Sequence, residues 1–162
     1  MKKTFLLIAV ISSFACFAQT EPAKTKEQPK KDKTKYYVNI NIDIVYKDKD
    51  GNDLLDVNSP KHYTDIVLFK MEKGEKIKID KPHMDHPNNQ FIFKDEVTRI
   101  NHLRVFLECE EVLVQLDAQT TDTIKCKIKK EKGSTVIEKV WYNGKLEWER
   151  GRDKSQVITI TK

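Results

Sequence analysis

Acidic and amide side chains gather in one short stretch after the first predicted strand. Asp48, Asp50 and Asn52 alternate along it, and their oxygen atoms are ligands of the kind that Ca²⁺ prefers. The spacing matches the first, third and fifth positions of an EF-hand loop. However, Asp53 stands where that loop needs glycine, and Ser59 stands where it needs a bidentate glutamate. The stretch is not an EF-hand, and two interpretations remain: a turn with solvated acids, or a calcium site.

Histidine and cysteine offer two further kinds of chemistry. His83 and His86 have the H-x-x-H spacing of two metal ligands, but no third ligand accompanies them at a convincing spacing. Cys109 and Cys126 are the thiols that remain once Cys16 is removed or lipidated, and in an oxidising compartment such a pair predicts a disulfide. A free, buried Cys126 would also pack well on its apolar strand face. Neither thiol has a nearby histidine to support nucleophilic catalysis.

Aromatic residues concentrate in one predicted β-hairpin. Asn143-Gly144 between two alternating runs favours a two-residue type I′ turn, because both central residues of that turn need a positive φ. This register pairs Trp141 with Leu146 and places Trp148 on the same face. The face either belongs to the core or forms an exposed platform on which a sugar could stack. The candidate ligand-binding residues are Trp141, Tyr142 and Trp148.

The elements that would position these residues are strands. From Tyr36 onward the apolar residues alternate with polar ones, which predicts a long half-buried strand that extends to Tyr46. Asp95–Asn101 is different, because an acidic cap candidate precedes apolar residues spaced by three, and it predicts one short helical turn. We expect an all-β fold, an antiparallel β-sandwich of the Ig-like or a related type. The further predicted strands are 66–71, 76–80, 90–93, 103–108, 112–116, 123–128, 136–142, 145–148 and 157–161.

The N-terminus has the three parts of an export signal. Lys2 and Lys3 form a positive start, residues 5–15 are nearly all apolar, and small residues follow. Cleavage after Ala18 would make residues 1–18 the signal peptide and release the protein into the periplasm or the medium. The alternative is a lipoprotein signal of residues 1–15, with an acylated Cys16 that anchors the chain to the outer membrane. No apolar stretch reaches the ~20 residues that a span of the mature chain would need.

The net charge of +5 is unevenly distributed. Residues 19–35 carry six lysines and three acids and no aromatic or β-branched aliphatic residue, which predicts a disordered linker. Residues 36–162, the predicted sandwich domain, contain 22 basic and 22 acidic residues. A nucleic-acid-binding domain concentrates positive charge on its own surface, so we expect no nucleic-acid partner.

One segment resembles a known group of proteins. Val45–Asp56 runs from a predicted strand into Gly51-Asn52-Asp53-Leu54-Leu55-Asp56, and this G-N-D-L-L-D stretch is similar to one in exported proteins and lipoproteins of Bacteroidota. Val57 stands where that group usually has proline. The resemblance implies an exported β-sandwich and brings no activity and no functional residues.

The sequence offers no catalytic motif, such as G-x-S-x-G, H-E-x-x-H or a phosphate loop, and hence no catalytic residue to name. We therefore expect a non-catalytic binding or interaction module whose partner is a protein or a glycan at the cell envelope. No cofactor other than Ca²⁺ is indicated. The alternative is a secreted hydrolase or inhibitor whose site is assembled from loops.

Overall fold

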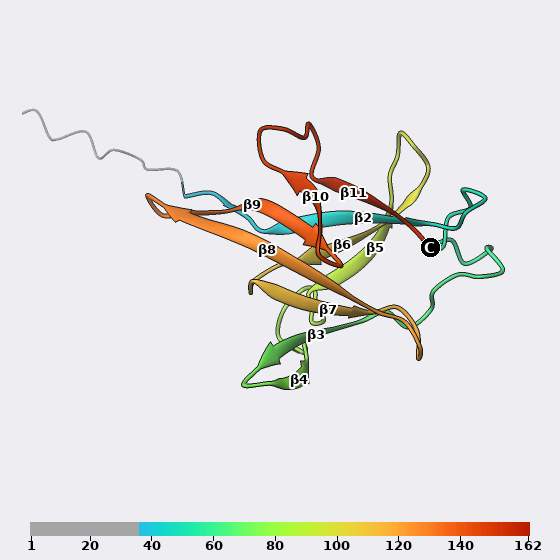
Figure 1. Ribbon diagram of the computed structural model, residues 1–162, viewed down its shortest axis with the longest axis horizontal. Coiled ribbons are helices and arrows are strands. Elements are labelled where there is room, and N and C mark those ends of the chain that lie inside the picture. The colour runs from blue at the N-terminus through green and yellow to red at the C-terminus, as the bar shows by residue number, and fades with distance from the viewer. Residues whose placement is uncertain (1–35) are drawn as a thin grey trace, which may run out of the picture. The chain divides into compact units, whose positions relative to one another are not determined.

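The computed structural model describes residues 36–162 (Figure 1). This part of the chain contains eleven strands and no helix. The strands form two sheets that enclose one core, so the predicted all-β sandwich is confirmed. The predicted signal peptide and linker, residues 1–35, lie outside the described residues. The strands are β1 (Val38–Asn39), β2 (Asn41–Lys47), β3 (Val67–Glu72), β4 (Glu75–Lys78), β5 (Gln90–Lys94), β6 (Asn101–Phe106), β7 (Glu111–Gln115), β8 (Thr121–Glu131), β9 (Ser134–Tyr142), β10 (Lys145–Glu149) and β11 (Val157–Thr161).

The two sheets differ in size. The seven-stranded sheet, here sheet A, has the order β1-β9-β8-β7-β3-β4, and β10 also pairs with β9. The four-stranded sheet, here sheet B, has the order β11-β2-β6-β5. Most pairs are antiparallel, as expected, but β1 runs parallel to β9 and β11 runs parallel to β2. The chain crosses from sheet A to sheet B directly after β1 and again between β10 and β11.

The first predicted strand is divided between the sheets. β1 pairs with β9 in sheet A, whereas β2 pairs with β6 and β11 in sheet B, and Ile40 lies between them. The carbonyl of Ile40 accepts a hydrogen bond of 2.7 Å from the amide of Leu107, which ties this crossing to the end of β6. The prediction of one continuous strand is wrong here, because a period-two pattern fixes which face is apolar but not which neighbour a strand pairs with.

The core lies between the inner faces of the two sheets. Sheet B contributes alternate residues of β2 and β6, and sheet A contributes alternate residues of β7 and β8, as the period of two requires. On β9 a bulge at Glu138 interrupts the alternation, so that Ile137 and Val140 both face the core. Leu54 and Leu55 close the core from the loop after β2, so the G-N-D-L-L-D stretch places its two leucines inside. The largest fully buried side chains are Tyr46, Ile42, Ile44, Leu68, Leu103, Leu107, Leu116, Ile124 and Ile137.

Both turns that were predicted from local sequence are present. Asn143 and Gly144 have φ values of 47° and 82°, and Tyr142 pairs with Lys145, so the predicted β9–β10 turn and its register are confirmed. Between β5 and β6, Asp95 Oδ1 accepts hydrogen bonds from the amides of Val97 (3.1 Å) and Thr98 (2.7 Å). The amide of Arg99 also bonds to the carbonyl of Asp95 at 2.9 Å, so the segment forms the single short turn that was predicted and does not extend into a helix. Residues 36–162 contain no helix that is long and apolar enough to cross a membrane.

Candidate functional site

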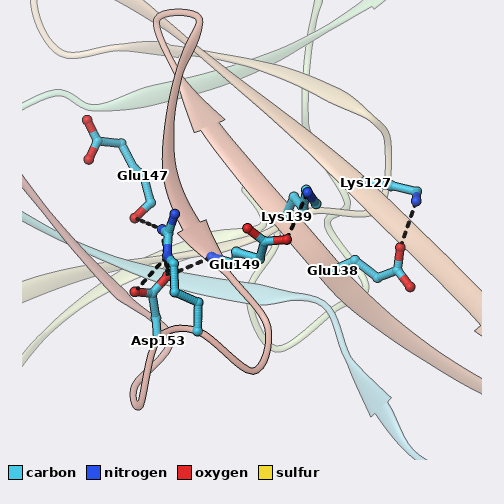
Figure 2. A network of polar contacts seen from close by, with 7 residues as sticks. Lys127, Glu138, Lys139, Glu147, Glu149 and Asp153 are labelled. Atoms are coloured by element: carbon cyan, nitrogen blue, oxygen red, sulfur yellow. Dashed lines mark hydrogen bonds and ion pairs between the residues drawn. The ribbon is translucent and has the colours of Figure 1, made fainter.

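A row of ion pairs crosses the outer face of sheet A. Lys127 Nζ lies 3.0 Å from Glu138 Oε2, and Lys139 Nζ lies 2.8 Å from Glu149 Oε1 (Figure 2). The hydrogen bond from Lys127 lowers the pKa of Glu138. Because these side chains come from β8, β9 and β10, the row links three neighbouring strands. Solvent screens such pairs, so each one contributes little to stability. They cover this face of sheet A with paired charged side chains.

The side chain of Asp153 caps the end of β10, next to the Lys139–Glu149 ion pair. Asp153 Oδ2 accepts a hydrogen bond of 2.7 Å from the amide of Glu149, at the end of β10. The guanidinium of Arg152 donates to the same oxygen at 2.8 Å and to the carbonyl of Glu147 at 3.3 Å. These contacts fix the loop that leads from sheet A to β11, and they lower the pKa of Asp153.

A hollow of about 450 Å³ opens beside Trp141, and Glu111, Lys125 and Gly144 are among its lining residues. Trp141 is half-buried on β9, directly opposite Lys125 on β8. Lys125 Nζ forms an ion pair of 3.1 Å with Glu111 Oε2 on β7. An indole ring beside a carboxylate and an ammonium group can bind a ligand that has both an apolar face and hydroxyl groups.

The other two predicted aromatic residues do not join Trp141. Tyr142 and Trp148 are each only 4% exposed and belong to the core. Trp141 does pair with Leu146, as predicted, but the register then shifts at Glu147 and Trp148 pairs with Val140. This β-bulge turns Trp148 inward, where its Nε1 donates to the carbonyl of Ser155 at 2.7 Å. The prediction that Trp141 and Trp148 share one face is therefore wrong.

Tyr142 belongs to a buried polar network that the sequence did not reveal. Its hydroxyl lies 2.6 Å from Asp122 Oδ2 on β8 and 3.0 Å from the hydroxyl of Tyr46 on β2. Asn143 Nδ2 donates to Asp122 Oδ1 at 2.7 Å, and Lys162 Nζ donates to Oδ2. Since a carboxylate only accepts hydrogen bonds, the Tyr142 hydroxyl donates to Asp122, and its oxygen is left to accept from Tyr46.

The electrostatics of this network hold each group in one protonation state. Burial raises the pKa of both Tyr46 and Tyr142 well above the usual tyrosine range. Burial by itself would raise the pKa of Asp122, but the hydrogen bonds from Lys162, Tyr142 and Asn143 together lower it. Neutral phenols thus surround an ionised, fully paired carboxylate. Such a network stabilises the fold and leaves no group free to transfer a proton.

The two cysteines lie close together and are free thiols in the structure. The Sγ of buried Cys126 donates to the carbonyl of half-buried Cys109 at 3.2 Å. The predicted β7–β8 hairpin is present, and the amide of Cys126 bonds to the carbonyl of Glu110. Burial raises the pKa of Cys126 to about 12 and also raises the pKa of Cys109. These are poor nucleophiles.

The three candidate calcium residues, Asp48, Asp50 and Asn52, form hydrogen bonds with one another within their own loop. Asp48 Oδ1 accepts hydrogen bonds from the amides of Asp50 (2.9 Å) and Asn52 (2.8 Å), and Asp48 Oδ2 accepts one from Asn52 Nδ2 (2.9 Å). These bonds lower the pKa of Asp48. In residues 36–162, no group of three or more His, Cys, Asp or Glu side chains is arranged to hold a metal ion.

Sequence reasoning missed an aromatic group on the outer face of sheet B. The ring of His86 stacks on Phe91 with centroids 4.2 Å apart, so this histidine of the H-x-x-H pair packs against a strand. Arg104 lies over Phe93 at 4.9 Å and forms two hydrogen bonds with Asp43, of 2.7 and 2.8 Å. Alternating phenylalanines in 90–93 were a signal for such a face, but they fitted an ordinary half-buried strand equally well.

Comparisons with known proteins add no relative. No protein-family model matches the chain, and neither a curated protein nor a solved structure matches it. Only the geometry of the structure therefore describes the candidate site. In that geometry, the hollow beside Trp141 combines an aromatic ring with charged groups that a ligand could contact.

Proposed function

We propose that the chain is an exported, non-catalytic binding module that takes up a glycan at the hollow beside Trp141. The observation that carries this proposal is the position of Trp141, half-buried on an open sheet face next to the Lys125–Glu111 ion pair. The two buried carboxylates of the described residues are already paired, Asp43 with Arg104 and Asp122 with its own network.

The chemistry of the hollow favours a sugar over a purely apolar ligand. The apolar face of a pyranose ring can stack on the indole of Trp141, while its hydroxyl groups bond to the carboxylate of Glu111 and the ammonium of Lys125. The rigid strands β7, β8 and β9 carry all three side chains, so the site needs little ordering when it binds. Export, predicted from residues 1–18, would bring the site to the glycans of the cell envelope.

Tryptophan fluorescence tests the proposal, because the two tryptophans differ in exposure. In a Trp148→Phe variant the emission comes from Trp141 alone, and we expect soluble envelope glycans, such as peptidoglycan fragments, to shift it. In a Trp141→Phe variant only Trp148 emits, and we expect no shift. Lys125→Ala should weaken the binding about tenfold, equivalent to about 1.4 kcal/mol. Melting curves show whether each variant is folded.

Two results would contradict the proposal. One is a Trp141 emission that iodide quenches but no glycan changes at any concentration tested. The other is an intact mass, measured for the protein from its native cells, that still includes residues 1–15, because the chain would then have kept its export signal. A mass that starts at Gln19 fits release, and a mass that starts at an acylated Cys16 fits a lipid anchor.

A further inference from the structure

The edge of sheet B formed by β11 differs from the other sheet edges in its side chains. β11 forms this edge, and its residues Val157–Thr161 are all β-branched, with no charge, proline or glycine. The edge strand β4 carries Glu75, Lys76 and Lys78, and β10 contains a bulge and three charged residues. Charges and bulges on edge strands prevent pairing with another chain. β11 has neither.

The opposite edge of sheet B is protected in two other ways. On β5, Ile92 and Lys94 follow the inner-facing side of the alternation, and an inward-pointing lysine at an edge opposes the approach of a further strand. In addition, Gln90 Nε2 donates to the carbonyl of Ile66 at 2.5 Å, so the segment before β3 lies against this strand. The remaining edge, β1, has only two residues, and a very short edge offers little for another strand to pair with. Among the edges of residues 36–162, β11 is thus the five-residue edge without such protection.

The hydrogen-bonding groups of β11 that face away from β2 have no partner strand. The carbonyl of Gln156 accepts from the amide of Asp43 at 3.0 Å, and the amide of Lys162 donates to the carbonyl of Lys47 at 2.8 Å. The even-numbered residues therefore bond to β2. The alternate residues Val157, Thr159 and Thr161 direct both their N–H and C=O groups to the other side. Within the described chain, β2 is the only strand paired with β11.

We propose that β11 pairs in antiparallel fashion with β11 of a second copy of this chain, about a two-fold axis at Thr159. Thr159 then lies opposite its own counterpart, and Val157 lies opposite Thr161 of the second copy. All of these are outward-bonding residues, so each opposed pair exchanges both of its N–H···O bonds. The two four-stranded sheets become one continuous eight-stranded sheet.

The absence of charge on β11 favours a second copy as the occupant, because two such strands can lie side by side without repulsion. In the proposed register no charged residue faces another, and the opposed pairs are β-branched, which is favourable in a sheet. The strand β4 shows the contrast: its outward-bonding residues are Lys76 and Lys78, so self-pairing about an axis at Lys76, Ile77 or Lys78 would place lysine opposite lysine. An isologous contact of this kind closes on itself as a dimer.

The test is the mass of the purified full chain as a function of concentration. A five-residue strand gives a small interface, so we expect a dimer that forms at about 1 µM to 1 mM and dissociates on dilution, as measured by sedimentation velocity. Hydrogen exchange supplies a second readout, because the amides of Val157, Thr159 and Thr161 should be protected only at the concentrations where the dimer forms.

Variants identify the edge that is used. Thr159→Pro removes a donor that bonds to nothing in the single chain, and Thr159→Lys places two lysines at the two-fold axis; each should weaken association at least tenfold and leave the melting temperature nearly unchanged. Ile77→Lys makes the matched change on β4 and should leave the dimer intact. A chain that stays monomeric up to about 1 mM overturns the proposal, and its edge would then be open to an extended segment of another protein. A dimer that survives both changes at Thr159 overturns it as well.

Discussion

Asp122 shows how a single side chain acquires its role from residues that are distant in the sequence. Lys162 is forty positions away and Tyr142 is twenty, yet both donate to the same carboxylate, which is only 4% exposed. A carboxylate in such a position is stable because three donors replace the water that it loses on burial. In the sequence Asp122 stands in a polar turn and resembles many solvated acids.

Replacing Asp122 with asparagine should destabilise the protein by about 2–3 kcal/mol, because Lys162 then keeps a partly buried charge without its counter-ion. The effect should depend on pH. Since the folded pKa of Asp122 lies below its usual 3.8, its stabilising contribution is complete above pH 3.8 and is lost as the pH falls toward the folded value. The melting temperature of the native protein should therefore fall more steeply below pH 4 than that of the variant. Asp65→Asn, at an exposed site, is the control and should change neither quantity.

The thiols allow a second prediction at this scale. With a pKa raised to about 12, Cys126 is a thiolate in only about one molecule in 10,000 at pH 8, so it should resist alkylation until the protein unfolds. Half-buried Cys109 should react slowly in the native state. Intact mass and peptide mapping before and after denaturation give the order of labelling. A gain of two hydrogens on reduction would instead show that the two residues form the predicted disulfide.

At the scale of single elements, the alternation of apolar residues predicted the strands. It did not predict which strands pair with each other. The register of the β9–β10 hairpin could be predicted because Asn143-Gly144 defines its turn locally. The inward rotation of Trp148 could not, since the bulge at Glu147 adds a residue that no local pattern announces. Ile40 is similar: the chain passes from one sheet to the other there, while the alternation continues without a break.

The hairpin turn yields the prediction that belongs to this scale. Gly144 has a φ of +82°, and a Cβ added there would meet no other atom within 4 Å, so only backbone strain opposes a side chain. Gly144→Ala should therefore cost about 1–2 kcal/mol in the free energy of unfolding. Gly144→Asn, the matched control, should cost less because asparagine adopts positive φ more readily. Equal costs in urea denaturation would show that the turn does not have this conformation when the protein is in solution.

For the whole molecule, the sandwich is stable because its two layers share one core and are joined by buried polar contacts. The apolar side chains pack across the gap without specifying direction, whereas the contact between Tyr46 of sheet B and Tyr142 of sheet A, with hydroxyls 3.0 Å apart, fixes how the layers face each other. Sequence patterns predicted both layers. They could not predict this contact, because it joins residues ninety-six positions apart.

The contributions of the two tyrosines should be unequal and coupled. Tyr46→Phe removes one buried hydroxyl and leaves Tyr142 bonded to Asp122, so we expect a loss of about 1 kcal/mol. Tyr142→Phe takes a donor from Asp122 and leaves the hydroxyl of Tyr46 buried without its partner, so we expect about 2–3 kcal/mol. The double variant should be somewhat more stable than Tyr142→Phe alone, because the orphaned hydroxyl is then gone. Urea unfolding of all four proteins gives the coupling energy, and simple additivity would mean that the two sheets are not joined through these hydroxyls.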